Sequence, residues 1–236
     1  MKIGIMQPYF MPYIGYWQLL NAVDKYVIYD DVNFIKGGWI NRNRILINGE
    51  AKFFNLPMIG ASSNKLINEV SVNDNKKIMN KNLRIIEAAY KKAPYYEIIY
   101  PMIKKILMNK KGNIADFIAE SFREICLYLN INTELIMSSS LDKNNELKGQ
   151  AKVLEICSLL HGTEYYNAIG GQELYSFSDF KKHDLNLKFL KTEKIEYEQY
   201  NNEFQSNLSI IDLLMFNSKD EIKEYLNRYT LVEEEQ

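Results

Sequence analysis

"KIGIMQPYFMPYIGYWQLLNAVDKYVIYDDV", residues 2–32, contains the pattern from which the fold can be predicted. Residues 2–6 form a short β-favouring run bounded by Pro8, which predicts a buried strand. Residues 13–23 carry apolar side chains at helical spacing, and residues 25–32 form a second β-favouring run that ends in two acids. A strand, a helix and a strand within about thirty residues make a βαβ unit. We therefore predict a parallel strand pair with a right-handed crossover.

The next segment predicts a hairpin and a loop. Residues 44–58 consist of two β-rich runs separated by Asn48-Gly49, which is the preferred dipeptide for a two-residue hairpin turn. Residues 60–75 are polar, so we expect them to form a surface loop.

The middle of the chain is predicted to be helical. Residues 76–130 carry apolar residues three and four apart, with breaks at Pro94 and at Lys111-Gly112. The later expected elements are a strand at 133–139, a helix at 148–162, a strand at 163–169, a helix at 177–183, a strand at 187–191 and a helical pair at 208–228. This order predicts a single α/β domain over residues 1–236, with a helical insertion at about 76–130 between two parts of its sheet.

Composition narrows the functional classes. The formal net charge is −1, so there is no overall positive field for nucleic-acid binding. Cys126 and Cys157 lie on apolar helix faces, which indicates reduced core thiols, and His161 and His183 have no second ligand at metal spacing, so no metal site is predicted. No signal peptide or run of about 20 apolar residues is present, so we expect a soluble, cytoplasmic protein.

The first candidate binding segment follows the first strand. In open α/β sheets, ligands bind at the carboxyl ends of the strands, against helix N-termini. We take Gln7, Tyr9, Tyr13, Gly15 and Tyr16 as candidate ligand-binding residues, because phenol and amide groups offer neutral hydrogen bonds and glycine permits close approach. The alternative is that the rings pack in the core, with their hydroxyls reaching the surface.

The second candidate segment is "YDDVNFIKGGWINRNRI", residues 29–45. Asp30 and Asp31 end a strand, where adjacent side chains face opposite ways, so at most one is expected to point into a crevice. If residues 41–44 are extended, the two asparagines share one face and the two arginines the other. Lys36 is a candidate catalytic residue, together with Asp30 and Asp31. The candidate ligand-binding residues are Trp39, Asn41, Arg42, Asn43 and Arg44. The alternative is a surface loop of offsetting salt bridges.

The third candidate segment is "TEYYNAIGGQELY", residues 163–175. A strand followed by Gly170-Gly171 predicts a tight backbone turn over a ligand, with Asn167 nearby. The segment has no GxGxxG pattern, so a dinucleotide-binding fingerprint is not supported.

Four stretches together resemble the WbqC-like family: "MQPYFMPYIGYWQLLNAVDKYVIYDDVNFIKGGWINRNRI" (6–45), "KGQAKVLEICSLLHGTEYYNAIGG" (148–171), "YEQY" (197–200) and "NLSIIDLLMFN" (207–217). "NAIGG" stands where the family would have a serine–glycine run. Members of this family are found with bacterial surface-polysaccharide genes, including clusters that make aminoacylated amino sugars. The resemblance implies a role in O-antigen or lipopolysaccharide biosynthesis, attaching an amino acid such as glycine to a sugar amine.

A more distant resemblance implies a Rossmann-like core. Residues 7–28 look like the first βαβ unit of the adenylyl-transferring superfamily of nucleotidyltransferases and pantothenate synthetases. The His-x-Gly-His motif of that superfamily would fall on residues 13–16, where tyrosines replace both histidines. Tyrosine supplies no imidazolium charge, so Lys36, Arg42 and Arg44 are the available cations.

Three functions remain open. The first is a transferase or ligase that acylates an amino sugar, free or nucleotide-linked. In it Lys36 and the two arginines hold phosphate or carboxylate, and Asp30 or Asp31 takes a proton or holds magnesium. ATP and Mg²⁺ are cofactors for its ligase version. The second is a module that binds a nucleotide or nucleotide-sugar without chemistry. The third is an aminoacyl-tRNA-dependent transferase, which the lack of a basic field disfavours.

Overall fold

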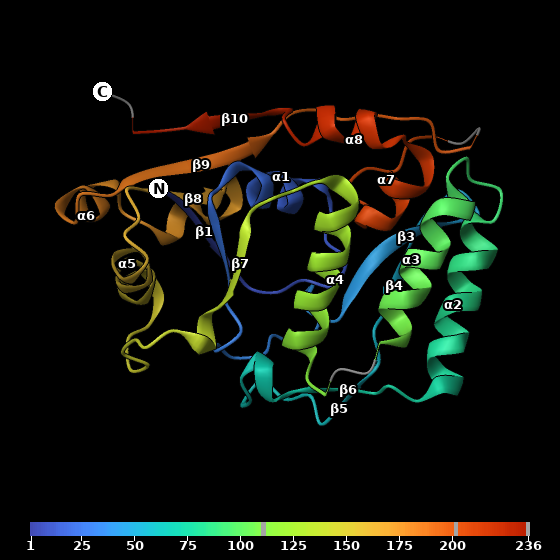
Figure 1. Ribbon diagram of the computed structural model, residues 1–236, viewed down its shortest axis with the longest axis horizontal. Coiled ribbons are helices and arrows are strands. Elements are labelled where there is room, and N and C mark those ends of the chain that lie inside the picture. Colours follow the sequence, from blue (N-terminus) through green and yellow to red (C-terminus); the bar gives the residue numbers. More distant parts are fainter. Residues whose placement is uncertain (110–111, 201–202, 235–236) are drawn as a thin grey trace.

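A six-stranded sheet forms the centre of the molecule (Figure 1). The computed structural model describes residues 1–109, 112–200 and 203–234. In spatial order the strands are β10 (Tyr229–Val232), β9 (Asn186–Thr192), β8 (Glu164–Ala168), β1 (Lys2–Met6), β2 (Lys25–Ile28) and β7 (Glu134–Met137). All neighbouring pairs are parallel except β10 and β9, which are antiparallel.

The N-terminal βαβ prediction is confirmed. The strand β1 pairs in parallel with β2, from Ile3 opposite Lys25 to Met6 opposite Ile28, and helix α1 (Ile14–Ala22) connects them. The strand β2 ends at Ile28, four residues earlier than predicted.

The strand order changes direction at β1. The strands β2 and β7 follow β1 on one side, whereas β8 and β9 lie on its other side. Where connections leave two neighbouring parallel strands in opposite directions, a crevice opens outside their carboxyl ends. The carboxyl ends of β1 and β8 are therefore where a binding site is expected.

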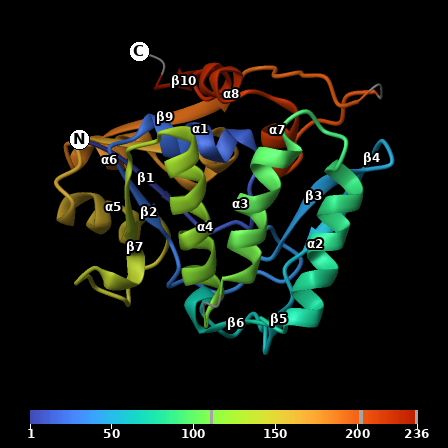
Figure 2. The same ribbon diagram turned by 45° about the vertical axis from the view of Figure 1, so that its right-hand side comes forward.

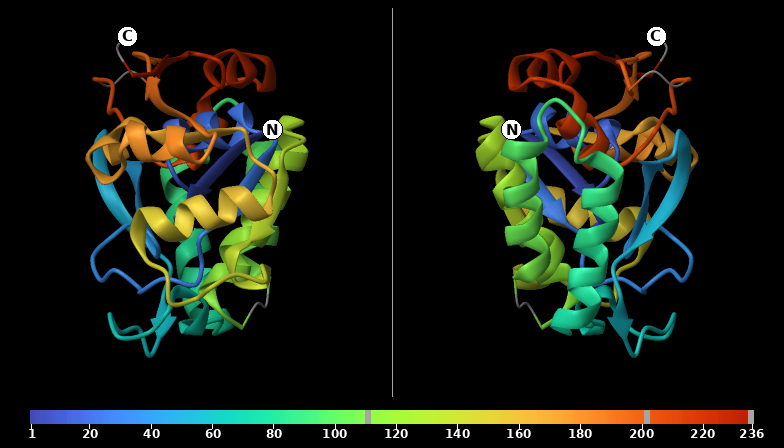
Figure 3. Two further views of the ribbon diagram at one scale, coloured as in Figure 1. Left: turned by 90° about the vertical axis from the view of Figure 1, so that its left-hand side faces the viewer. Right: turned by 90° about the vertical axis from the view of Figure 1, so that its right-hand side faces the viewer.

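Two hydrophobic layers cover the sheet. Alternate strand residues point to opposite faces, so Tyr26 and Tyr166 pack with α1 and α4 (Ile114–Leu129), whereas Val27 and Tyr165 pack with α5 (Gly149–Leu159) and α6 (Phe177–Lys182). Figure 3 shows α5 at one end of the molecule and helices α2 (Lys76–Tyr90) and α3 (Tyr96–Met108) at the opposite end.

The long connection from β2 to β7 contains the predicted hairpin and helices. The hairpin is β3 (Arg42–Ile47) and β4 (Glu50–Asn55), and both turn residues have positive φ, 53° at Asn48 and 79° at Gly49, as the predicted turn requires. Figure 2 shows this hairpin beside α2 and α3. Pro94 separates α2 from α3 and Gly112 lies between α3 and α4, while Lys111 is outside the described residues.

Several short elements differ from the expectation. The loop predicted at 60–75 contains a 3-10 turn, η1 (Ile67–Glu69), and the strand β6 (Ser71–Val72), which pairs with β5 (Met58–Ile59). The predicted final helical pair is α7 (Ile210–Phe216) and α8 (Lys219–Tyr225), but the edge strand β10 after it was not predicted. The other short elements are η2 (Ser138–Ser140) and η3 (Ile169–Leu174).

The connection between β1 and α1, residues 7–13, is held by side chains from distant segments; we call it the elbow. Asn43 Nδ2 donates to the carbonyls of Phe10 and Met11, at 3.1 and 2.9 Å, and Ser209 Oγ donates to Met11 at 2.7 Å. The Pro12 carbonyl accepts from the Ile210 amide at 2.9 Å. These bonds hold Met11 in the left-handed region, at φ 44°.

We expect Asn43→Ala to lower the free energy of unfolding by about 1–3 kcal/mol, because the buried Phe10 carbonyl loses its described donor and the Met11 carbonyl keeps only that of Ser209. Chemical denaturation measures this change. Asn41→Ala is the matched control, since the Asn41 amide makes one long bond of 3.3 Å to Leu56. An equal loss in both variants would contradict the role assigned to Asn43.

A buried carboxyl group joins α7 to α2 and to the strand-like segment after β9. Asp212 is fully buried and accepts hydrogen bonds from Tyr90 at 2.9 Å, Tyr197 at 2.7 Å and Gln199 at 2.7 Å. Burial raises the pKa of Asp212 to about 6, although these hydrogen bonds lower it. The folded state therefore holds a proton that the unfolded chain releases near pH 4.

Because the folded pKa of Asp212 is the higher one, we expect its contribution to stability to fall as the pH rises from about 4 to about 6. The fall amounts to about 3 kcal/mol. Asp212→Asn should remove this part of the pH dependence, measured by denaturation at pH values from 4 to 7. Asp220→Asn, at a side chain that is 92% exposed, should leave it unchanged.

Candidate functional site

A cavity of about 850 Å³ opens at the carboxyl ends of β1 and β8. This is the crevice at which the strand order changes direction. Nine of the predicted site residues line it: Gln7, Tyr9, Tyr13, Trp39, Asn43, Arg44, Asn167, Gly170 and Gly171. The elbow and the 39–44 segment therefore share one cavity. The seven predicted residues outside its lining are Gly15, Tyr16, Asp30, Asp31, Lys36, Asn41 and Arg42.

The elbow divides its polar groups between the cavity and the core. Tyr16 is 2% exposed, and its hydroxyl donates to the Gln7 carbonyl at 2.8 Å. Its ring therefore packs in the core, which was the alternative to ligand binding. The close approach that Gly15 permits is to protein. A Cβ there would lie 2.6 Å from both the Tyr13 ring and the Thr192 hydroxyl.

Four side chains on the cavity wall have free hydrogen-bonding groups. Gln7, Tyr9, Tyr13 and Tyr29 line the cavity, and within the described residues their side chains make no hydrogen bond. Burial raises the pKa of Tyr9 and of Tyr13, so both hydroxyls stay neutral near pH 7. The wall therefore offers neutral donors and acceptors to a ligand.

The three predicted cations have different surroundings. Arg42 donates to the carbonyls of Gly37 and Gly38 and stacks on Phe53, so it holds its own loop. Lys36 is exposed and makes no contact of this kind among the described residues. Arg44 lines the cavity, with its Nε buried and without an acceptor.

Residues 42–44 are extended at the start of β3, and their burial alternates, with Asn43 buried and both arginines partly exposed. Asn43 and Arg44 are adjacent, yet both line the cavity. The Asn43 amide is engaged by the elbow carbonyls, whereas Asn41 bonds to Leu56. Asn43 is therefore a positioning residue, and Arg44 has the free polar group.

The wall formed by β8 and η3 is closely packed. Asn167 Nδ2 donates to the Tyr165 hydroxyl at 2.6 Å, and a Cβ on Gly171 would lie 2.7 Å from Asn167 Oδ1. Gly170-Gly171 forms part of the 3-10 helix η3, which follows β8 directly. A Cβ at Gly170 would meet open space, so the backbone there is accessible from the cavity.

The two acids predicted to be catalytic lie behind the cavity wall. Asp30 is fully buried and accepts from the amide and hydroxyl of Ser139, at 2.9 and 2.6 Å, and from Asn68 at 3.1 Å. Asp31 Oδ2 lies 2.7 Å from Lys143 Nζ and 3.0 Å from Lys152 Nζ. Both lysine side chains are at least 95% buried, which makes a closed ion cluster.

The ion cluster was not predicted, because its members are remote in sequence. Lys143 and Lys152 follow Asp31 by more than one hundred positions and carry no local signal. Burial raises the pKa of Asp31, but the contacts with Lys143 and Lys152 outweigh it and hold the pKa below its ordinary value. Lys152 also lies over the Tyr29 ring, 5.3 Å from its centroid, so the cluster supports a ring of the cavity wall.

The cavity does not fit magnesium or ATP. No carboxylate is among the described residues that line it, whereas protein-bound Mg²⁺ takes one or two carboxylates together with substrate phosphates. The described residues contain no group of three histidine, cysteine or acidic side chains placed to hold a metal. Cys126 and Cys157 are free and buried, and burial raises the pKa of each to about 12.

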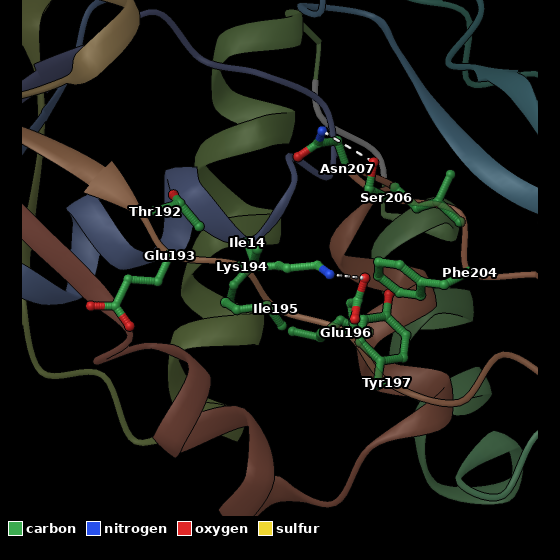
Figure 4. A pocket seen from close by; sticks show the side chains of 12 residues that line it. Ile14, Thr192, Glu193, Lys194, Ile195, Glu196, Tyr197, Phe204, Ser206 and Asn207 are labelled. Carbon is green, nitrogen blue, oxygen red and sulfur yellow. Dashed lines mark hydrogen bonds and ion pairs between the residues drawn. The ribbon is translucent and has the colours of Figure 1, made fainter.

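A second, smaller cavity of about 460 Å³ lies on the other side of Asn207, which lines both (Figure 4). Its lining includes an exposed ion pair between Lys194 and Glu196, at 2.9 Å, and a long hydrogen bond from Asn207 to Ser206, and the Tyr197 hydroxyl donates to Asp212. Because these groups already have protein partners, the larger cavity is the better candidate site.

Comparison with known proteins identifies relatives over nearly the whole chain. A family model, the WbqC-like protein family, matches residues 7–224. The chain is 27% identical to an uncharacterized protein, Rv1507c, of Mycobacterium tuberculosis (strain ATCC 25618 / H37Rv), over 231 residues that cover 95% of this chain and 97% of the relative. No solved structure matches the chain. No helix in the described part of the chain is long and apolar enough to cross a membrane.

We expect Asp31→Asn to lower the free energy of unfolding by about 3–5 kcal/mol at neutral pH, because it leaves two buried lysines without their anion. Urea denaturation measures the loss. Since the folded pKa of Asp31 is the lower one, the contribution disappears as the pH falls below about 4. Glu50→Gln breaks an exposed pair with Lys52 and should cost less than about 1 kcal/mol. A loss as small for Asp31 would argue against the buried cluster.

Proposed function

The chain belongs to the WbqC-like protein family, and from that membership and the cavity we propose that it acylates an amino sugar during bacterial surface-polysaccharide biosynthesis. The acyl group is an amino acid such as glycine, and the products are O-antigen or lipopolysaccharide components made in the cytoplasm. The observation that carries the proposal is the shared cavity of the elbow and the 39–44 segment, because both belong to the motif on which the family resemblance rests.

The size and chemistry of the cavity support a sugar substrate. A volume of about 850 Å³ lies within the usual range for small-molecule sites. Its free amide and phenol groups suit the hydroxyls of a sugar, and the Trp39 and Tyr13 rings offer flat apolar faces. The reversal of strand order at β1 supports a Rossmann-like, nucleotidyltransferase-like core as part of this proposal.

In this proposal Asp30 and Asp31 stabilise the cavity wall and do not contact the reacting atoms. Asp31 would have to leave Lys143 and Lys152 before it could accept a proton from the attacking amine. Lys36 lies outside the lining, so the cation that contacts substrate is Arg44. A preactivated acyl donor suits this arrangement better than ATP, because no carboxylate of the described lining is placed to hold magnesium.

A second candidate function is a binding module for a nucleotide or nucleotide-sugar, without chemistry. The observation that favours it is the lining, whose described residues include no aspartate, glutamate, histidine, cysteine or lysine to act as a general acid, general base or nucleophile. Binding measured by calorimetry, with every bound compound recovered unchanged, would favour this function over acyl transfer.

To test acyl transfer, the protein is incubated with an amino sugar and three glycine donors separately: a glycyl thioester, glycine with ATP and Mg²⁺, and glycyl-tRNA. We expect the thioester to yield an amide that mass spectrometry detects. Tyr13→Phe should lower kcat/KM about three- to tenfold without changing stability, because it removes a hydroxyl that bonds to no described protein group.

Tyr16→Phe is the matched control for this assay. It removes a hydroxyl that bonds to the Gln7 carbonyl, so it should cost about 1 kcal/mol of stability and alter kcat/KM less than Tyr13→Phe does. Amide formation from none of the donors, over a panel of amino sugars, would remove the proposal. If the amide forms only from glycyl-tRNA, or only from glycine with ATP and Mg²⁺, that compound is the acyl donor in place of a thioester.

A further inference from the structure

The described residues that line the cavity include a single charged side chain. Arg44 supplies it, and none of the other described lining residues is an aspartate, glutamate, lysine or histidine. The acids nearest in sequence to this wall, Asp30 and Asp31, are bonded to groups behind it. The cavity therefore carries an uncompensated positive charge of one unit.

The Arg44 guanidinium lacks the acceptors that it needs. Its Nε is buried and has no hydrogen-bond partner, and its Nη2 donates to the Asn207 carbonyl at a long 3.4 Å. Among the described residues no carboxylate lies within ion-pair distance of it. Because Nε is enclosed, an anion in the cavity would bind at the terminal Nη atoms, where it would supply the negative partner that the guanidinium lacks. The two parallel N–H groups of a guanidinium match the two oxygens of a carboxylate.

The rest of the cavity wall suits the uncharged, polar part of a ligand. Gln7, Tyr9, Tyr13 and Tyr29 supply uncharged hydrogen-bonding groups, and Trp39 at the mouth is 39% exposed and offers a ring face. The start of helix α5, at Gly149 and Gln150, adds the equivalent of about half a positive charge. The total stays below the two negative charges of a nucleotide-diphosphate sugar and well below those of ATP.

We infer that the ligand of this cavity is a sugar acid with one negative charge, a uronate or a related sugar carboxylate, and that its carboxylate binds to Arg44. The inference rests on the proposed function only in placing the ligand in this cavity. The charge preference requires no acyl transfer.

The test compares ligands that differ in charge alone. D-glucuronate and D-galacturonate are titrated beside their neutral amides, D-glucuronamide and D-galacturonamide, with UDP-N-acetylglucosamine and ATP–Mg²⁺ as the more highly charged probes. Binding is followed by amide chemical shifts in NMR spectra. We expect at least one uronate to bind about tenfold more tightly than its amide, and more tightly than either nucleotide.

Variants assign the charge preference to Arg44. Arg44→Gln should remove the difference between uronate and amide, and Arg44→Lys should retain part of it, because lysine keeps the charge but loses the two-pronged geometry. Lys36→Gln removes the same charge from the same segment outside the cavity, so it should bind like the original protein. If Arg44→Gln does not fold, as judged by its NMR spectrum, then Arg44→Lys against Lys36→Gln decides the comparison.

Several results would overturn the inference: equal affinity for uronate and amide, tighter binding of either nucleotide, no uronate binding, or a preference that survives the loss of Arg44. Its failure is separable from that of the proposed function. Uronate binding without amide formation in the acyl-transfer assay would contradict the proposed acylation but not the charge preference. Amide formation from a neutral amino sugar, with no uronate binding, would contradict the charge preference but not the proposed acylation.

Discussion

The hydrogen bonds that Asn43 and Ser209 donate to the elbow carbonyls are the constraint on which the site depends. The elbow contains two prolines, and Met11 adopts a left-handed conformation, so regular structure cannot satisfy its buried carbonyls. Side chains from β3 and from the start of α7 satisfy them instead. Three segments that are remote in sequence are thereby joined at the point where β1 opens into the cavity.

Buried ion pairs between Asp31 and two lysines stabilise a second wall of the cavity. Asp30 and Asp31 follow the end of β2. They bind the connection between β7 and α5 through Ser139 and Lys143, and α5 itself through Lys152. The start of α5 lines the cavity, so this cluster fixes the second wall as Asn43 fixes the first. Adjacent acids at a strand end resemble catalytic groups in sequence, yet here their bonds place them in the supporting structure.

Local patterns predicted most of the fold, and long-range contacts explain what was missed. The βαβ unit and the Asn48-Gly49 turn are encoded within short windows, and both were confirmed. The strand β10 is a short edge strand after a helix, and it had no turn signal of its own. The cavity-lining residues at the strand ends were predicted from their position, whereas the lysine partners of Asp31 could not be, because they lie on segments far along the chain.

The two tryptophans occupy contrasting places. Trp17 is fully buried, and its Nε1 donates to the Pro12 carbonyl at 3.1 Å, whereas Trp39 stands at the cavity mouth with Phe53 against it. Indole emission depends on solvent contact. The two tryptophans therefore report separately, one on unfolding of the elbow and one on occupancy of the cavity mouth. Replacing Trp39 with phenylalanine would leave an optical probe of the interior alone.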